Sequence, residues 1–439
     1  MLALGTGMMT TRYQTTNITT GAIAIDLPVG DDLVVAAGVL VRSTTWIAVS
    51  GQSADHDVQV YGTISGNIAA IRLGADFAAN NNTSVRVMNG GAVQGDSIGI
   101  YFAGGSNVVI NEGSISANPT YEYGCRAIYL DDETGAGASQ IINRGLITAA
   151  IGIYATKESL IVRNSGTIDS QGYAIWGSSS DDTVKNYGAM IGQIKLANGN
   201  DLYDGRTGTI DGVIFGGEGN DKLFAGAGDN ELHGDAGHDQ LVGGAGRDIL
   251  DGGAGIDRVM YTSATSGLTA HLARPWINTG DAKGDTYIGI ERLTGSHFDD
   301  RLTGDAAAND IVGDDGNDVI NGHLGNDTLT GGLGEDTFVF NLAFRASTNV
   351  DTITDFTPSD DTIQIDNAVF TGLSTGTLAS SAFKANFSGN ANDPTDRIIY
   401  ESDTGRLYFD ADGNGAGAKI HFATLDPGLT LTNADFVVI

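Results

Sequence analysis

The stretch GGEGNDKLF-AGAGDNELH-GDAGHDQLV-GGAGRDILD-GGAGIDRVM fills residues 216–260 with five nonapeptides and no gap. A second run, GSHFDDRLT-GDAAANDIV-GDDGNDVIN-GHLGNDTLT-GGLGEDTFV, fills residues 295–339, and a degenerate copy, LANGNDLYD, lies at 196–204. Each nonapeptide has Asp or Asn at its sixth place and an apolar residue at its eighth. Regular repetition of this glycine- and aspartate-rich pattern predicts a parallel coil of short strands joined by metal-binding turns.

The first six residues of each nonapeptide form a turn in which glycines allow the backbone carbonyls to point inward around a cation. Two nonapeptides complete one coil, so the sixth side chains stack in columns about 4.8 Å apart. These oxygen ligands select calcium over softer metals, and we expect at least six ions, bound more weakly beside the two asparagines. The predicted ligands are Asp221, Asp239 and Asp257 beside Asn230 and Asp248, then Asp300, Asp318 and Asp336 beside Asn309 and Asp327.

From residue 204 onward the chain resembles secreted RTX proteins of Gram-negative bacteria. The stretch DGRTGTIDGVIFGGEGNDKL is similar to the start of their β-rolls, and GDTYIGIERLTGS is similar to the connector between two rolls. The stretches DTITDFTPSDDTIQID and YFDADGNGAGAKIHFATL resemble the C-terminal domain of serralysin-type proteases, and the last residues, 435–439, an uncleaved type I secretion signal. The resemblance implies export by a type I secretion apparatus, an extracellular or cell-surface location, and folding driven by extracellular calcium.

The first two hundred residues carry a different repeat, with the triplet Asn-x-Gly at 89–91, 111–113, 143–145, 164–166 and 186–188. A period of about 22 residues, short apolar strands and no helical periodicity predict a parallel β-helix. Asparagines at equivalent corners would stack in a ladder of amide hydrogen bonds. The longer step from Asn111 to Asn143 predicts an inserted loop at 116–140 that contains the single cysteine, Cys125, whose replacement by Ser we expect to be harmless.

The predicted fold is all-β: an N-terminal parallel β-helix, two calcium-binding parallel β-rolls and a C-terminal β-rich secretion domain. The expected boundaries are an N-terminal segment at 1–30, the β-helix at 31–204, the rolls at 205–260 and 295–340 with a connector at 261–294, and the secretion domain at 341–439.

The composition of the chain and the absence of certain motifs exclude several classes of function. The 439 residues contain 23 Lys and Arg against 54 Asp and Glu, a formal charge of −31, which argues against binding to nucleic acid or to anionic membranes. No apolar run is long enough to span a bilayer. HExxH is absent, which excludes a zinc protease of the serralysin kind. The G-x-S-x-G match at 95–99 lies in a predicted solenoid coil rather than at a nucleophile elbow.

Two classes of function remain open. The absence of a complete catalytic set favours a non-enzymatic surface protein, such as an S-layer, filament, matrix or adhesive component, that self-associates through residues 1–30. The alternative is a polysaccharide lyase or epimerase acting through the 116–140 loop, with extracellular polysaccharide as partner; a toxin is a third, weaker reading. The loop's candidate side chains are Tyr121, Glu122, Tyr123, Arg126, Asp131, Asp132 and Glu133.

One further acidic loop stays undecided. Asp410, Asp412 and Asn414 match the start of an EF-hand loop, but the twelfth position is His421 instead of Glu, and the flanks have strand character. The sequence is consistent with a plain hairpin turn or with a weak calcium site.

Overall fold

The computed structural model describes residues 10–74, 82–118, 124–135, 137–343 and 348–439. These residues form strands, turns and four short 3-10 helices, so the predicted all-β parallel solenoid is confirmed. No helix in those ranges is long and apolar enough to cross a bilayer. The chain divides into an N-terminal unit, residues 1–243 with 253–255, and a C-terminal unit, residues 244–252 with 256–439. The domain boundaries expected from the sequence stay predictions.

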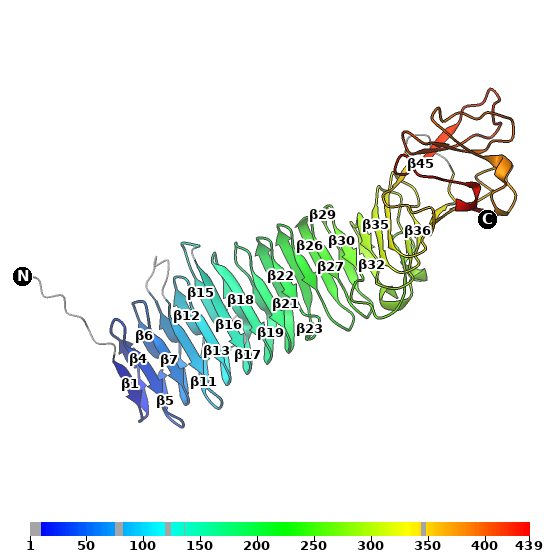
Figure 1. Cartoon of the computed structure of the whole chain (residues 1–439). Helices are drawn as coiled ribbons and strands as arrows, with labels where there is room; N and C mark the ends of the chain where they lie inside the picture. Colours follow the sequence, from blue (N-terminus) through cyan, green and yellow to red (C-terminus); the bar gives the residue numbers. More distant parts are fainter. Residues whose placement is uncertain (1–9, 75–81, 119–123, 136, 344–347) are drawn as a thin grey trace, which may run out of the picture. The chain divides into compact units, whose positions relative to one another are not determined.

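The N-terminal unit is a stack of parallel strands, which Figure 1 shows side by side from β1 to β26. Its first face consists of β1 (Thr11–Gln14), β4 (Asp32–Val35), β7 (Asp57–Val60), β10 (Ser84–Val87), β13 (Val108–Asn111), β16 (Ala138–Asn143), β18 (Ser159–Asn164), β20 (Thr183–Asn186), β22 (Leu202–Asp204), β25 (Lys222–Phe224) and β27 (Gln240–Val242). Each strand pairs in parallel with the next.

Two further faces complete each coil. The second face consists of β2 (Ile18–Thr20), β5 (Leu40–Ser43), β8 (Thr63–Gly66), β11 (Ala92–Gly95), β14 (Ser114–Ala117) and β23 (Thr209–Asp211). The third consists of β3 (Ile25–Leu27), β6 (Val49–Gly51), β9 (Ala69–Leu73), β12 (Ile98–Ala103), β15 (Arg126–Asp131), β24 (Val213–Glu218), β26 (Glu231–Gly237) and β29 (Ala254–Gly255). Three long strands run through both faces: β17 (Leu146–Ala155), β19 (Thr167–Trp176) and β21 (Ala189–Asn198).

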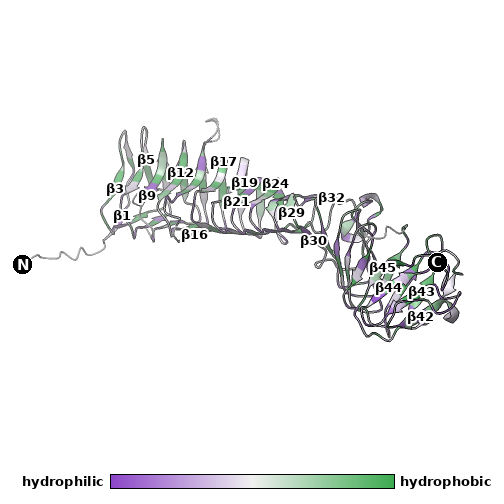
Figure 2. Cartoon of the chain, turned by 90° about the horizontal axis from the view of Figure 1, so that it is seen from above, coloured by the Kyte–Doolittle hydropathy of each residue, from purple (hydrophilic) through white to green (hydrophobic). Residues whose placement is uncertain are grey.

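The strand β23 is the last one of the second face. After it, each coil has two faces instead of three, and the β-helix continues as a two-sided roll. The core continues across this change because the eighth residue of each nonapeptide stays in register with a buried residue of the helix: Val184 pairs with Tyr203, and Tyr203 with Leu223. Alternate burial along the strands follows from the period of two in a β-strand, and Figure 2 shows hydrophobic colour recurring from strand to strand. All ten predicted eighth residues are buried: Leu223, Leu232, Leu241, Leu250, Val259, Leu302, Ile311, Ile320, Leu329 and Phe338.

The asparagine ladder is present and has four members. The Nδ2 group of Asn111 donates to Oδ1 of Asn143 (2.8 Å), Asn143 to Asn164 (2.7 Å) and Asn164 to Asn186 (2.9 Å). The prediction for the triplet at 89–91 is wrong: Val87 is the residue in register with Asn111, and Asn89 is exposed in the following turn. The β-helix before Asn111 therefore packs this corner with valines instead of amides.

The predicted inserted loop is only partly a loop. Residues 126–131 form β15, a regular strand of the third face that pairs with β12 and β17. Cys125 is buried directly before this strand, and its Sγ lies 3.5 Å from the carbonyl oxygen of Asp96. The cysteine is therefore part of a packed coil rather than of a protruding loop, because the ten extra residues of this coil fall on either side of β15.

The C-terminal unit repeats the two-sided coil. One ladder runs through β30 (Arg258–Met260), β33 (Arg292–Thr294), β35 (Asp310–Asp315), β37 (Thr328–Leu333) and β39 (Asp351–Ile353). A second runs through β31 (Thr269–His271), β34 (Arg301–Thr303), β36 (Val319–Asn321), β38 (Thr337–Phe340) and β40 (Thr362–Ile365). A third pair, β28 (Ile249–Asp251) with β32 (Thr286–Ile288), includes part of the predicted connector. The connector also holds the 3-10 helices η1 (Pro275–Ile277) and η2 (Gly280–Ala282).

The last strands of the chain extend both ladders, and each also pairs with an antiparallel strand, β44 (Arg406–Phe409) or β41 (Gly376–Thr377). The strand β45 (Ile420–Thr424) pairs with β39, and β46 (Phe436–Val438) pairs with β40, so the predicted secretion signal lies in a buried strand. The rest of this region comprises β42 (Phe383–Asn386), β43 (Ile398–Glu401), η3 (Ser380–Ala382) and η4 (Asn433–Asp435). The acidic loop with Asp410 and Asp412 joins the antiparallel strands β44 and β45. This arrangement is the hairpin turn that the sequence left open as one of two possibilities.

Candidate calcium sites

The nonapeptide turns adopt a backbone that few residues other than glycine accept. In the first repeat, Gly217 has a φ of 116° and Gly219 a φ of 128°, in the region where a Cβ clashes with the backbone. A Cβ at Gly219 would lie 1.8 Å from the carbonyl oxygen of Gly199 in the preceding coil. The glycine pattern thus arises both from the turn conformation and from the close approach of stacked coils.

The sixth residues form columns linked by hydrogen bonds. The backbone N–H of Asp221 donates to Oδ1 of Asp239 (2.7 Å), and in the C-terminal unit that of Asp300 donates to Asp318 (2.8 Å) and that of Asp318 to Asp336 (2.9 Å). The parallel column begins with the N–H of Asn309, which donates to Oδ1 of Asp327 (2.7 Å). All ten sixth residues predicted as ligands are buried: Asp221, Asn230, Asp239, Asp248, Asp257, Asp300, Asn309, Asp318, Asp327 and Asp336.

The second carboxylate oxygen of several sixth residues is buried in the turn without a partner. The Oδ2 atoms of Asp221, Asp318 and Asp327 are buried and have no hydrogen-bond partner among the described residues. A Cβ added to Gly313 would lie 2.1 Å from Oδ2 of Asp318 and 2.4 Å from the carbonyl oxygen of Gly331 in the next coil. Oxygens from two stacked turns therefore lie so close to this glycine that no larger side chain fits there.

These carboxylates are electrostatically unfavourable without a cation. Burial, together with repulsion from Asp300 and Asp336, raises the pKa of Asp318 to about 8. Burial, followed by repulsion from Asp351, likewise raises the pKa of Asp327 to about 8. A buried charge is costly unless it is paired or bound to a metal. Carboxylate and carbonyl oxygens in a flexible turn suit calcium, which takes six to eight oxygen ligands, so the residues present fit this ion.

The two asparagines differ from the aspartates in what they contact. The Nδ2 group of Asn230 donates to the carbonyl oxygens of Gly226 (3.1 Å) and Gly228 (2.7 Å) in its own turn. Oδ1 of Asn309 accepts from the N–H of Asp305 (2.8 Å). An amide that donates to the turn's carbonyls uses oxygens that an ion would need, so weaker binding at Asn230 remains our expectation.

The columns extend into segments that the repeat pattern does not mark. The N–H of Asp248 donates to Oδ1 of Asp285 (2.9 Å), and the N–H of Asp257 donates to Oε2 of Glu291 (2.9 Å), both acceptors within the predicted connector. Beyond the second run, Asp351 and Asp361 accept in the same way from Asp327 and Asp336. Their turns lack the full glycine pattern, but Glu291, Asp351 and Asp361 each come two residues before a buried strand residue, as in a nonapeptide.

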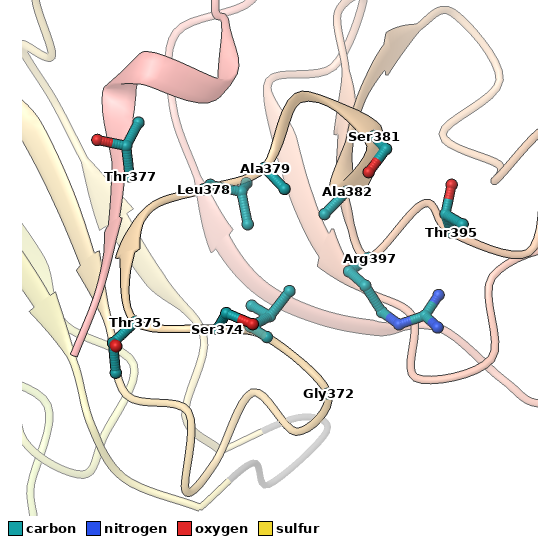
Figure 3. Close-up of a pocket in the computed structure, with 11 residues that line it drawn as sticks. Gly372, Ser374, Thr375, Thr377, Leu378, Ala379, Ser381, Ala382, Thr395 and Arg397 are labelled. Atoms are coloured by element: carbon teal, nitrogen blue, oxygen red, sulfur yellow. The ribbon is translucent and has the colours of Figure 1, made fainter.

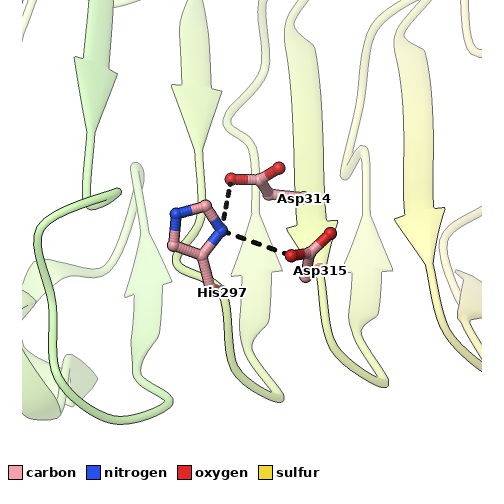
Figure 4. Close-up of side chains that lie close together, drawn as sticks. All are labelled: His297, Asp314 and Asp315. Atoms are coloured by element: carbon pink, nitrogen blue, oxygen red, sulfur yellow. Dashed lines mark ion pairs between the residues drawn. The ribbon is translucent and has the colours of Figure 1, made fainter.

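A histidine lies beside two exposed acids in the same region (Figure 4). Nδ1 of His297 is 3.2 Å from Oδ2 of Asp314 and 3.6 Å from Oδ2 of Asp315. More than half of the His297 side chain is exposed. The three groups form a surface ion-pair cluster.

A hollow in the C-terminal unit has a volume of about 270 Å³ and is lined by nine residues of the segment 372–382 together with Thr395 and Arg397 (Figure 3). Its charged side chain, Arg397, donates from Nη1 to the carbonyl oxygens of Pro394 (2.8 Å) and Asp396 (2.9 Å). The remaining lining is small and weakly polar, and no acid–base pair accompanies the arginine among these lining residues.

The described candidates of the 116–140 loop take structural roles. Oδ1 of Asp132 accepts from the N–H (2.9 Å) and the hydroxyl (2.7 Å) of Thr134, and Oδ2 of Asp131 accepts from the hydroxyl of Tyr101 (2.7 Å). The carbonyl of Glu133 accepts from Lys157. Tyr121, Glu122 and Tyr123 lie outside the described residues. The described part therefore shows no acid and base facing a common space.

A column of rings and cations runs along the outer side of the third face, and we call it the ring column. It consists of Arg72, Tyr101, Tyr129, Tyr154, Trp176, Lys195, Phe215 and His233, one from each successive coil and all in register. Neighbouring ring centroids lie 5.1 Å apart for Tyr101 and Tyr129, and 5.2 Å apart for Tyr129 and Tyr154. The guanidinium of Arg126 lies 4.7 Å from the ring centroid of Tyr129 and 4.6 Å from that of Tyr154. The sequence offered no periodic signal for this column because coil lengths vary.

Comparison with known protein families supports the interpretation of the nonapeptides as calcium-binding repeats. The family model of the RTX calcium-binding nonapeptide repeat matches four times, at residues 206–241, 225–259, 285–320 and 303–338. No curated protein matches the chain. Among solved structures, the AlgE6R3 subunit of the Azotobacter vinelandii mannuronan C5-epimerase is similar, with 27% identity over 33% of this chain and 76% of that chain and a TM-score of 0.25.

A second solved structure, the extracellular lipase LipA from Serratia marcescens, is 15% identical over 76% of this chain, with a TM-score of 0.16. The match spans 45% of the lipase chain. RTX nonapeptide repeats bind calcium, and the columns of buried sixth-position carboxylates lie within the matched ranges or directly beside them. Residues 206–259 and 285–338 therefore match the RTX calcium-binding nonapeptide repeat in sequence.

Proposed function

We propose that this protein is a secreted, calcium-binding structural component of a bacterial surface or matrix that folds and assembles on extracellular calcium. The observation that carries the proposal is the set of buried carboxylate oxygens without partners at Asp221, Asp318 and Asp327, each within glycine turns of the RTX pattern. RTX repeat proteins are typically secreted by Gram-negative bacteria, which supports an extracellular location.

The proposed ligands are the sixth residues of both runs, with at least six ions in total. The chain's charge of −31 disfavours the compact state where free calcium is low, as in the cytoplasm. Millimolar extracellular calcium would compensate the columns and favour the folded state by mass action. Titration with calcium after EGTA treatment tests this: we expect far-UV circular dichroism to report a gain of β-structure at millimolar calcium. An unchanged β signal in excess EGTA would contradict it.

Export is proposed to use a type I secretion apparatus that reads the C-terminal segment 425–439. Deletion of this segment in a secreting host should leave the protein inside the cell. Because β46 is part of the fold, the control is Phe436→Ala, which disturbs packing but keeps the segment. Secretion of the deletion variant at the wild-type level would remove this argument for an extracellular location.

Self-association is proposed to use the N-terminal end of the solenoid. Strands β1, β2 and β3 pair with β4, β5 and β6 on one side, and the described residues provide no strand on the other. Such edges favour pairing with another chain. Tyr13 on β1 is 72% exposed, which makes this edge accessible. Calcium would favour the contact by lowering the repulsion between highly acidic copies.

Light scattering in millimolar calcium tests the edge. Tyr13→Lys should reduce the oligomer, because a lysine on an edge strand opposes pairing. Tyr187→Lys is the matched control, since Tyr187 is 54% exposed but lies in mid-solenoid. A wild-type protein that stays monomeric at high concentration would overturn the assembly proposal, and equal oligomers in both variants would move the contact away from β1.

A second candidate function is contact with an acidic extracellular polysaccharide, and the ring column favours it. Rings can stack on the apolar faces of sugars, while Arg72, Arg126 and Lys195 offer positive charge on a strongly acidic chain. Retention on immobilised alginate or pectate should fall in Trp176→Ala and stay unchanged in Tyr187→Ala. A parallel assay for unsaturated uronates or a changed epimer ratio tests the lyase or epimerase alternative through the 116–140 loop.

A further inference from the structure

The turn 177–182, GSSSDD, has the same internal hydrogen bonds as the turn 295–300, GSHFDD, that opens the second run of nonapeptides. In the first, the N–H of Ser178 donates to Oδ2 of Asp182 (2.7 Å) and its hydroxyl to Oδ1 (2.9 Å). In the second, the N–H of Ser296 donates to Oδ2 of Asp300 (2.5 Å) and its hydroxyl to Oδ1 (3.0 Å). The β-helix therefore contains a column-opening turn before the first matched repeat at residue 206.

The next coil also has the RTX turn conformation. Ala197 has a φ of 86° and Gly199 a φ of 128°, and Ala197 lies in register with Gly217, whose φ is 116°. A φ of this sign is unfavourable for alanine. The turn in LANGNDLYD thus has the same backbone conformation as the nonapeptide turns, although two of the three glycines of the pattern are replaced, by Leu196 and Ala197.

Hydrogen bonds join these two coils to the first repeat in the same pattern as in the rolls. The N–H of Asp182 donates to Oδ1 of Asp201 (2.6 Å), and the N–H of Asp201 donates to Oδ1 of Asp221 (2.8 Å). The fifth positions follow: the N–H of Asn200 donates to Oδ1 of Asp181 (2.7 Å). One column of acids therefore runs from Asp182 through Asp201 into the first RTX repeat.

Oxygens from two stacked coils lie close together beside a glycine on this column. A Cβ added to Gly177 would lie 2.4 Å from Oδ2 of Asp182 and 2.5 Å from the carbonyl oxygen of Leu196 in the next coil. At Gly313 in the roll, the corresponding distances are 2.1 Å to a carboxylate and 2.4 Å to a carbonyl. Asp201 is 2% exposed, and its Oδ2 has no hydrogen-bond partner within the described ranges.

Charge in this part of the column is uncompensated. Asp201 and Asp182 are both buried, with 2% and 1% of their surface exposed, and each lies next to a further acid of the column. The nearby hydrogen-bond donors satisfy both oxygens of Asp182 but only Oδ1 of Asp201, which makes Asp201 the residue in greatest need of a cation.

We infer that the column holds two further calcium ions, one on either side of Asp201, in coils that lie outside the RTX repeats. The ligands are the carboxylates of Asp182, Asp201 and Asp221 with backbone carbonyls such as that of Leu196. Calcium then joins the last coils of the β-helix to the first coils of the roll, so that ion binding stabilises part of the helix as well. The inference rests on the proposed calcium binding of the rolls.

Calcium stoichiometry of the full-length protein tests the inference through Asp201→Asn. The amide keeps an oxygen that can accept from the N–H of Asp182 but removes the charge of the carboxylate. We expect the variant to lose at least one bound ion per chain in equilibrium dialysis at saturating calcium. Asp211→Asn, the same change at an exposed acid on β23, should bind as many ions as wild type. Equal stoichiometry in wild type and Asp201→Asn would overturn the inference.

A crystal of the wild-type protein grown in calcium provides a test that needs no variant. The anomalous difference map should show peaks between the turns 177–182 and 196–201 and between 196–201 and 216–221, in addition to those in the rolls. Peaks in the rolls without peaks at these two places would overturn this inference and leave the proposed function standing. A map with no peak in the rolls would overturn both.

Discussion

At the scale of single residues, asparagine and aspartate side chains both form hydrogen bonds between neighbouring coils, at two different corners of the coil. Each uses one oxygen to accept a hydrogen bond from the neighbouring coil. The asparagine also donates, so within its column only Oδ1 of the first member, Asn111, has no partner among the described residues, whereas Asp221, Asp318 and Asp327 each leave an oxygen and a negative charge unsatisfied. This difference explains why the amide ladder needs no ion and why the carboxylate columns do.

Asn164→Ala should destabilise the β-helix by about 2–4 kcal/mol, because unsatisfied buried polar groups cost about 1–3 kcal/mol each. The change removes the acceptor of Asn143, the donor to Asn186 and the donor to the carbonyl of Ala189. Urea unfolding in calcium measures the effect. Asn89→Ala alters the same triplet type at an exposed site and should stay within about 0.5 kcal/mol of wild type. Equal effects of the two changes would show that the ladder contributes nothing.

Asp318→Asn should have opposite effects with and without calcium. In calcium we expect about tenfold weaker binding, because a contact of a charged group is worth about 1.5–3 kcal/mol. In EGTA the variant should be more stable than wild type, since a buried charge has been removed. Thermal unfolding under both conditions checks the reversal, with exposed Asp403→Asn as control. Destabilisation in both conditions would mean that Asp318 is only a structural hydrogen-bond acceptor.

At the scale of the element, the stacked column decides how the carboxylates titrate. In the metal-free fold the pKa of Asp318 and that of Asp327 rise to about 8, from an ordinary value of 3.8. The folded state then binds more protons than the unfolded state between these limits, so the stability of the metal-free fold is greatest at low pH and falls as pH rises from about 4 to 8.

Calcium affinity should therefore increase with pH up to about 8, because protons compete for the same oxygens and are released on binding. Isothermal titration calorimetry in buffers of different ionisation enthalpy measures this proton release. The rise should level off above the raised pKa values. An affinity independent of pH between 5 and 8 would show that the carboxylates are already charged, and hence compensated, before calcium binds.

Strand β46 lies between β40 and β41 in the C-terminal unit, and the centroid of the buried Phe436 ring lies 5.4 Å from that of Phe383. Phe436→Ala should cost about 3–5 kcal/mol, as expected for a large aromatic side chain in a core. The melting temperature of the calcium-loaded protein reports the loss. Phe387→Ala, at a ring that is 78% exposed, is the control and should change little. Equal melting temperatures in both variants would show that the packing of Phe436 on β46 does not stabilise the C-terminal unit.

Sequence periodicity predicts those elements in which the repeat and its structural cause coincide. The glycines and sixth-position acids of the nonapeptides determine the turn, and they predict the roll and its buried column directly. Asn89 carries the Asn-x-Gly triplet two residues away from the ladder position, which only the register of β10 reveals. Asp182, Asp201 and Asp285 were missed as column members because their turns lack part of the glycine pattern. The available signals were the GSxxDD shared by 177–182 and 295–300 for Asp182, and the degenerate copy at 196–204 for Asp201.

At the scale of the whole molecule, one chain combines coils that satisfy their own polar groups with coils that need an ion. The β-helix from β7 to β14 contains no carboxylate column among its described residues, so its stability should not depend on calcium. The coils with columns should depend on it strongly. A protein of this design can remain partly unfolded at low calcium and complete its folding where calcium is abundant.

Hydrogen exchange measured by mass spectrometry, with and without calcium, tests the central claim most directly. Amides in residues 216–260 and 285–338 should be protected in millimolar calcium and exchange fast in excess EGTA, whereas amides in 57–73 and 84–117 should be protected in both. The last two ranges serve as an internal control for the overall fold. Equal protection of the RTX coils in calcium and in EGTA would contradict the account, because the columns would then be stable without the ion.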